Sequence, residues 1–332
     1  MRHFGPEDRT VERLAAHKVL PMMVPVALLL IGALTSVVAP RLLARADWTD
    51  REPVVALWVW QCAVAAVLLC CALSMTLSAA AAWQVVRRHV FATAPRGVVD
   101  AYALGTAGPW AAPTAVLLAC AGLWSLAMLV REVARTRARR RGQRAELLVR
   151  APLLPGEEPT GGRLVVLEGD RPDAWWLPGA APRLVVTTAA LRRLRGRRLD
   201  ALLAHEQGHA QARHDWLLHC SAALADGFPR VPVFAAFRDE MHRLVELAAD
   251  DTASRHFGRL TTALALVELN EERGVFGPGP TPQAHVPQRV HRLLTAPDRL
   301  PAPRRLRLTA SAALVPVIPL LVALVPGLRA LG

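Results

Sequence analysis

The sequence predicts a membrane α-helical protein with four transmembrane helices and an α+β domain inserted between the third helix and the fourth. Two observations lead to this prediction. Apolar residues make up 53% of the chain, and they are concentrated in four stretches without a charged residue, each long enough to cross a bilayer as a helix. The segment between the third and fourth stretches is rich in charges and alternates short strand patterns with helix patterns, as a folded domain outside the membrane does.

The four charge-free stretches are residues 20–40, 53–86, 101–130 and 308–328. We place three transmembrane helices in an N-terminal membrane region, residues 1–130, and a fourth at residues 308–328. Buried core helices of a soluble protein would be interrupted by charged residues, so we do not favour that alternative. The first three helices are expected at about residues 20–40, 54–83 and 109–130, with Trp58, Trp60, Trp83 and Trp110 near the boundaries where Trp prefers to lie.

The positive charge predicts the orientation of these helices. The net charge of +13 comes almost wholly from arginine, since Lys18 is the only lysine. A basic chain can indicate nucleic-acid binding, but here the arginines lie beside the third and fourth spans, where topology or anionic lipid explains them. We therefore expect no direct nucleic-acid partner, and a multi-pass cell-membrane protein with a cytoplasmic inserted domain and both termini outside. The arginines concerned are Arg131, Arg135, Arg137, Arg139, Arg140, Arg141, Arg144, Arg299, Arg304, Arg305 and Arg307.

One alternative topology stays open. The tripeptide Ala44-Arg45-Ala46 after the first apolar stretch resembles a signal-peptidase site. Cleavage there would send the inserted domain outside the cell, against the arginine distribution, and the apolar stretch is longer than the usual core of a signal peptide.

The inserted domain, residues 131–307, begins with short strands and continues with helices. Its first part is an arginine-rich segment next to the membrane. Glycine and proline separate the later elements, and the Gly/Pro-rich residues 274–287 are expected to form a loop. The expected strands are 163–168, 174–177 and 183–188, and the expected helices are 189–195, 199–225, about 237–256, 259–272 and 290–294.

The helix at 199–225 contains His205-Glu206-Gln207-Gly208-His209. Residues four apart lie one above the other on a helix, so both imidazoles can reach one metal ion. Glu206 is rotated by about 100° from His205, which suits a general base acting on a water that the metal activates. Gly208 costs the helix about 1 kcal/mol relative to Ala, which indicates that another group approaches closely there. Two surface histidines on an ordinary helix are the alternative, which the apolar surroundings disfavour.

A catalytic zinc site usually takes three protein ligands. Glu246, on the next long helix, is the best candidate for the third. Asp250 follows one turn later on the same face, where it can orient a ligand histidine. His242 shares this face and is the main rival, whereas His214 would lie almost opposite His205 on one continuous helix. A solvated acidic helix face is the alternative without a metal. The remaining candidate ligands are Asp215 and His219.

The chain resembles the BlaR/MecR-type integral membrane zinc metallopeptidases, a gluzincin family. The resemblance implies a gluzincin-like domain in which His205, His209 and Glu246 bind Zn²⁺ and Glu206 is the catalytic base. It also implies that the strand before the motif helix, residues 183–188, is an edge that binds an extended substrate. It rests on residues 177–179, 183–188 and 205–215, on Glu246-Leu247-Ala248-Ala249-Asp250, and on three spans before the domain with one after it.

The resemblance implies a membrane-embedded zinc endopeptidase that cleaves a cytosolic or membrane-proximal protein, such as a transcriptional repressor in a signalling pathway. Sensor members of the family carry an external penicillin-binding domain after the last span. Because this sequence stops at Gly332, we do not expect direct β-lactam sensing. A housekeeping peptidase of the prenyl-protein or HtpX-like type is the first alternative. The second is a non-catalytic membrane signalling scaffold, against which the intact Glu206 argues. Candidate oxyanion donors are His242, His285, His291, Arg289 and Arg292.

Overall fold

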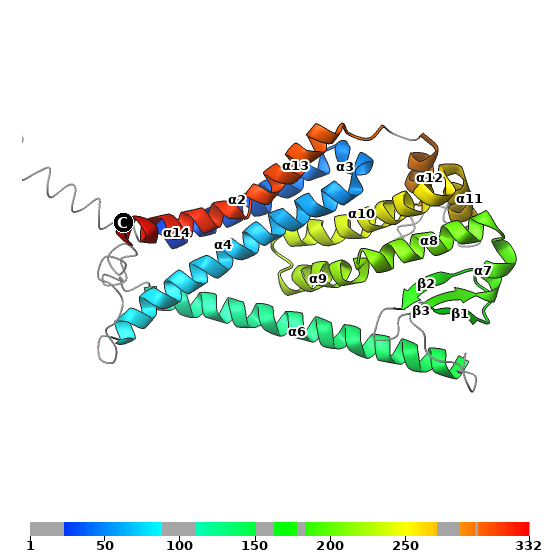
Figure 1. Ribbon diagram of the computed structural model, residues 1–332. Coiled ribbons are helices and arrows are strands. Elements are labelled where there is room, and N and C mark those ends of the chain that lie inside the picture. The colour runs from blue at the N-terminus through cyan, green and yellow to red at the C-terminus, as the bar shows by residue number, and fades with distance from the viewer. Residues whose placement is uncertain are drawn as a thin grey trace, which may run out of the picture.

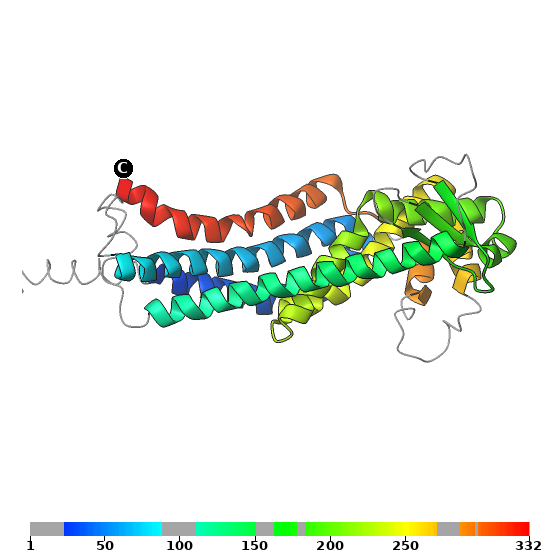
Figure 2. The ribbon, with the colours of Figure 1, turned by 90° about the horizontal axis from the view of Figure 1, so that it is seen from below.

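The computed structural model describes residues 23–87, 111–150, 163–177, 183–270, 286–295 and 298–331. The molecule is elongated (Figure 1). Apolar helices from both ends of the chain lie together at one end, and a small sheet with shorter helices lies at the other. Figure 2 shows a single helix, α6, that runs beside both parts.

Two N-terminal helices are long and apolar enough to cross a membrane. They are α2 (Met23–Ala44) and α4 (Pro53–Arg87), and the short helix α3 (Trp48–Arg51) lies between them. The candidate spans within them are Val24–Ala44, with a mean hydropathy of 2.1, and Pro53–Ala80, with a mean hydropathy of 2.3. Both agree with the predicted first and second spans.

Helix α6 (Ala111–Arg150) continues without a break through the boundary predicted at residue 130. The apolar residues of the predicted third span therefore share one helix with the arginine-rich segment that follows them. Residues 109 and 110 of that span lie outside the described part of the chain, and the span stays a prediction.

The fourth predicted span is not a single straight helix. Residues 308–328 fall on α13 (Ala302–Leu314) and α14 (Val317–Leu331), which meet at a bend of 43°. The break lies at Val315 and Pro316, because proline has no amide hydrogen to donate to the preceding turn. Val315 itself keeps helical φ and ψ angles of −58° and −49°. If the bent pair is one span, the described residues hold three candidate spans.

The sheet has three strands in the order β1-β3-β2. They are β1 (Arg163–Leu167), β2 (Ala174–Leu177) and β3 (Arg183–Thr187), as predicted to within one residue. β3 pairs in parallel with β1 and antiparallel with β2. The expectation that the strand at 183–188 forms an edge is therefore wrong. β3 is the most buried strand, with Val185 and Val186 fully enclosed, and burial of this kind favours the central position.

The helix predicted at 199–225 is two helices. The chain leaves helical geometry at Ala212 and Arg213, where Arg213 has a φ of 51°, and then turns into a second helix. Helix α10 begins at Pro232 rather than near residue 237, since proline is well suited to the first turn. Most of the expected loop 274–287 lies outside the described residues. The helices are α7 (Thr188–Arg193), α8 (Arg197–Gln211), α9 (His214–Gly227), α10 (Pro232–Phe257), α11 (Arg259–Asn270) and α12 (Val286–Thr295).

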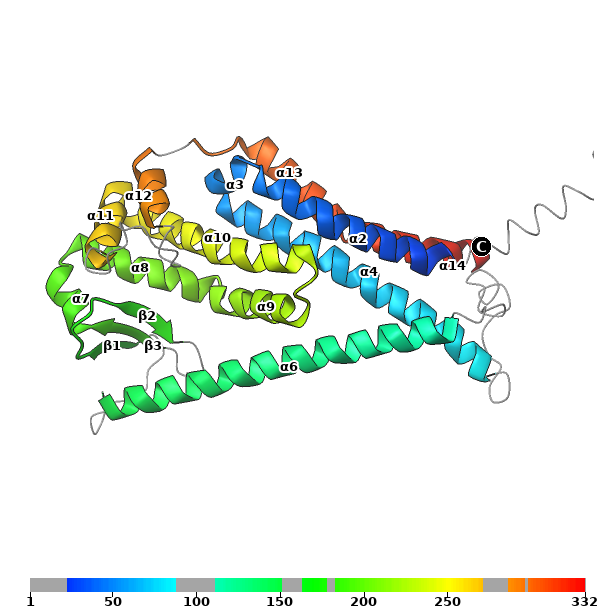
Figure 3. The same ribbon diagram turned by 180° about the vertical axis from the view of Figure 1, so that it is seen from behind.

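Helix α10 joins the membrane helices to the rest of the domain (Figure 3). Its buried residues Phe237 and Leu244 belong to one apolar core with Trp60 and Val64 of α4. The rings of Trp60 and Phe237 are 6.3 Å apart. The two regions are therefore packed against each other rather than linked by a flexible tether.

The turn between α2 and α4 is also bound to the domain. Arg243 of α10 forms an ion pair with Asp50, and the Glu52 carboxylate accepts a hydrogen bond from the Leu300 amide at 3.1 Å. Arg292 of α12 donates to the Asp50 carbonyl at 2.6 Å. This turn and the inserted domain consequently lie on the same side of the helices that we expect to span the membrane.

Candidate metal centre

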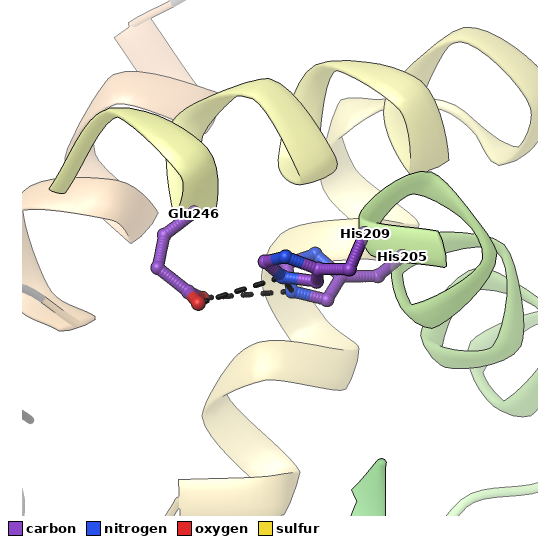
Figure 4. A group of neighbouring side chains, drawn as sticks. All are labelled: His205, His209 and Glu246. Atoms are coloured by element: carbon purple, nitrogen blue, oxygen red, sulfur yellow. Dashed lines mark hydrogen bonds and ion pairs between the residues drawn. The ribbon is translucent and has the colours of Figure 1, made fainter. Parts of the chain in front are cut away.

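Helix α8 brings the two motif histidines together. Their Nε2 atoms are 3.1 Å apart, as the four-residue spacing predicts. The helix starts after Gly196, which has a φ of 55° that glycine adopts without strain. The negative charge of Asp200 in its first turn interacts favourably with the positive end of the helix dipole. Figure 4 shows both rings turned toward the same point beside α10.

Glu246 of α10 reaches that point from the opposite side (Figure 4). Its Oε2 lies 3.6 Å from His205 Nε2, and its Oε1 lies 3.4 Å from His209 Nε2. Gly208 leaves room for the close approach of α10, because a Cβ atom at this position would make a tight contact of 3.2 Å with Thr252 Cβ and would lie 3.5 Å from Ala249 Cα. The glycine inside the motif thus lies where another helix approaches closely, as its cost to the helix led us to expect.

The group fits a zinc ion. One ligand atom from each of His205, His209 and Glu246 lies within 4.8 Å of the others, and within the described residues this is the one group of His, Cys, Asp and Glu side chains with such spacing. Ligands about 2.0–2.1 Å from a tetrahedral zinc ion lie about 3.3–3.4 Å from each other, close to the separations observed here. Two imidazoles and one carboxylate are also a donor set that catalytic zinc sites use.

Asp250 contacts the ring of His205 on the side away from the candidate metal site. Its Oδ1 lies 3.0 Å from His205 Nδ1, and its side chain is fully buried. A hydrogen on Nδ1 donated to this carboxylate leaves Nε2 with a free lone pair directed at the centre. The structure therefore places Asp250 where the sequence predicted a residue that orients a ligand.

His214 lies behind the second histidine, as the neighbour of a candidate ligand and not as a member of the ligand group. Its Nδ1 is 3.0 Å from His209 Nδ1, and only 3% of the residue is exposed. On an unbroken helix it would point away, but the left-handed conformation of Arg213 turns the chain so that His214 faces back. No glycine or proline marks this break in the sequence.

Arg289 of α12 binds both acidic residues, so it is not a free candidate for an oxyanion donor. Its Nη1 lies 2.7 Å from Glu246 Oε2. Its Nη2 and Nε donate to the two oxygens of Asp250 at 2.7 and 2.8 Å. Nothing in the local sequence signals this contact, which joins residues 39 positions apart.

The other residues considered as ligands or oxyanion donors lie elsewhere. His242 and His291 are exposed and are not part of the metal-ligand group. Arg292 is paired with Asp251 at 2.8 Å. His285 lies outside the described residues.

Glu206 lies beside the ligand group, in a cavity of about 170 Å³ that Asp173, Ala174, Glu246 and Arg289 also line. Burial raises the pKa of Glu206 to about 7, although the nearby charge of His205 and a hydrogen bond from the Trp176 backbone act in the opposite direction. A carboxylate with a pKa near neutrality can accept a proton and later release it.

Burial and neighbouring charges also shift the pKa values of the candidate ligands His209 and Glu246. Burial lowers the pKa of His209 to about 3, so its ring is neutral and can bind a metal. Burial alone would raise the pKa of Glu246, but the charge of Arg289 and the hydrogen bond and charges of the two histidines together hold the pKa below its usual value.

At His205 the neighbouring carboxylates have the larger combined effect. Burial alone would lower its pKa, but hydrogen bonds to Asp250 and Glu246 raise the pKa to about 10. The carboxylates that attract a proton to this ring would equally attract a cation at the same point.

Residues 135–296 match the model of Peptidase family M48. The match covers the sheet, the motif helix, the Glu246 helix and α12, and it supports a metallopeptidase of the M48 kind. The apolar helices packed on this segment indicate that the protein is associated with a membrane. No curated protein and no solved structure matches the chain.

Proposed function

We propose that this protein is a membrane-embedded zinc endopeptidase whose catalytic domain faces the cytoplasm. The observation that carries the proposal is the convergence of His205, His209 and Glu246 on one point with Glu206 beside them. The match to Peptidase family M48 supports the same chemistry from an independent direction. The arginine distribution supports the cytoplasmic orientation.

The residues divide the chemistry between them. Zinc, when bound, supplies a Lewis acid that acidifies water and polarises a carbonyl group. Glu206 accepts a proton from the attacking water and passes it to the departing amide nitrogen. Asp250 and His214 hold the two ligand rings in the required orientation, and Arg289 fixes Glu246.

We propose the edge of β2, rather than β3, as the strand that holds an extended substrate. Within the described sheet β2 pairs on one side only, with β3. Its residue Trp176 hydrogen-bonds to Glu206 through the backbone, and Ala174 lines the cavity at the metal centre. A peptide added to this edge would pass directly beside the catalytic base.

The proposed substrate is a cytosolic or membrane-proximal protein. A transcriptional repressor is the substrate that the BlaR/MecR-type resemblance implies. A housekeeping peptidase of the HtpX-like type is the second candidate, and the match to family M48 is equally compatible with it.

A comparison of cells that carry the wild-type protein with cells that carry Glu206→Gln tests these alternatives. Membrane and cytosolic fractions would be searched for fragments that depend on Glu206. One repressor fragment favours the regulatory function, whereas fragments of many membrane proteins favour the housekeeping function. Identical fragment sets from the two strains, with zinc bound to both proteins, would contradict the assignment as an endopeptidase.

A further inference from the structure

We propose that the tip of the α9–α10 hairpin, residues 220–237, is embedded in lipid on the side of the membrane where the domain lies. This tip belongs to the segment that the sequence assigns to the domain outside the membrane. The inference rests on the packing of the hairpin against the spans and does not require the proposed peptidase activity.

Contacts between the apolar helices fix the level at which the hydrocarbon region begins. Ser74 of α4 donates to the Pro25 carbonyl of α2 at 3.2 Å. Since these helices are antiparallel, Pro40, the last residue of the first charge-free stretch, lies level with Val59 of α4. Trp58 donates to the Thr309 carbonyl at 3.2 Å, so the fourth charge-free stretch begins at the same level. The ends of these two stretches, on α2 and α13, therefore place the edge near residues 58–59 of α4.

The hairpin continues past this edge along α4. Phe237 packs its ring against Trp60, and Val233 and Phe234 belong to the same buried core as Val64 and Val67. At 1.5 Å per residue, Val64 and Val67 lie about 7–12 Å beyond Val59. Because Arg243 pairs with Asp50 and Phe237 packs on Trp60, α10 runs antiparallel to α4. The first turns of α10 therefore lie beyond Trp60, beside residues of the second predicted span.

Contacts with α6, on the other side of the hairpin, also place the tip inside the hydrocarbon region. Trp124 donates to the Gly227 carbonyl at 3.2 Å, and a Cβ atom at Gly227 would lie 3.3 Å from Met128 Cβ. Both α6 residues precede Arg131, the first charged residue after the third charge-free stretch. The hairpin tip therefore lies about one to two turns inside the edge on α6 as well.

The composition of the hairpin suits this position. Residues 220–237 contain only two charged side chains, Asp226 and Arg230. Asp226 pairs with Arg238 at 3.6 Å, and Arg230, which is exposed, is long enough to reach the lipid head groups. Trp216 is 58% exposed and lies three turns back along α9, at the level where Trp prefers the membrane–water interface.

Photocrosslinking of the full chain tests the inference. The photoreactive residue p-benzoylphenylalanine would replace Arg230 in one variant and Pro232, the exposed first residue of α10, in another. The control is the same replacement at Leu260, which is 62% exposed. Leu260 belongs to α11, a helix at the end of the molecule away from the apolar helices (Figure 1). Each protein is placed in vesicles of phosphatidylethanolamine and phosphatidylglycerol, illuminated, and weighed intact by mass spectrometry.

We expect lipid adducts to be severalfold more abundant at residues 230 and 232 than at residue 260. Adducts at either tip position in a variant that elutes like the wild type support the inference, so a folding failure in one variant does not decide the test. Tip adducts no more abundant than those at residue 260 would overturn it. Because the readout needs no substrate, it is separate from any failure of the peptidase proposal.

Discussion

Arg289 and Asp250 form a buried two-point ion pair, with Nη2–Oδ1 and Nε–Oδ2 distances of 2.7 and 2.8 Å. Both residues are at least 90% buried. The same guanidinium contacts Glu246, so one cation from α12 pairs with both of these acidic residues of α10. Helix α12 is thereby a structural part of the metal centre.

Replacement of Arg289 by Met should be strongly destabilising. It would leave the buried Asp250 carboxylate without its cation, and loss of one partner from a buried pair costs about 3–5 kcal/mol. The decrease in the free energy of unfolding can be measured by denaturant titration in detergent. The exposed Arg255 provides the matched control, and an Arg255→Met variant should unfold like the wild type. Equal stability of the two variants would show that the pair contributes little.

Glu206→Gln should keep zinc and lose proteolysis. The amide has a similar shape but cannot accept a proton, so we expect a loss of about 10²–10⁴-fold in kcat. Zinc content by elemental analysis and cleavage of a peptide library are the two measurements. Full activity with bound zinc would remove Glu206 from the mechanism.

Glu246→Ala should lose zinc, whereas His242→Ala should retain it. Glu246 offers the one carboxylate of the proposed ligand group, and the exposed His242 on the same helix is not in that group. Elemental analysis of both purified variants gives the comparison. Stoichiometric zinc in Glu246→Ala would place the third ligand elsewhere.

His214→Phe should weaken zinc binding without removing a ligand. The ring of His209 would lose the partner of its Nδ1 atom, and loss of such a partner typically lowers metal affinity by about 10–100-fold. Competition with a chelator of known affinity measures the change. His256→Phe is the control at an exposed histidine, and equal affinities in the two variants would assign His214 a packing role only.

The sequence predicted the strands and the candidate metal centre best where the pattern lies within a single strand or helix. The two histidines are one turn apart, so helical geometry alone brings them together. Glu246 and Asp250 are likewise one turn apart, and their common face follows from the same rule. Gly208 signalled the close approach of α10 because a glycine in a helix is costly unless space is needed.

The sequence could not predict contacts that depend on the path of the chain. The αL conformation of Arg213 brings His214 to His209, although arginine has no preference for that conformation. Arg289 reaches Glu246 only because α12 packs beside α10. The central position of β3 is set by the pairing of all three strands, which alternation within one strand does not encode.

Helix α10 is one continuous rod of 26 residues. Its first half is packed on α4, and Arg243, three residues before Glu246, is bound to the turn between α2 and α4. A tilt of α2 and α4 would consequently displace Glu246, the proposed oxygen ligand, because α10 has no break between these contacts and Glu246. In the proposed membrane peptidase, a stimulus received at the far face of the bilayer would therefore have a direct mechanical route to Glu246.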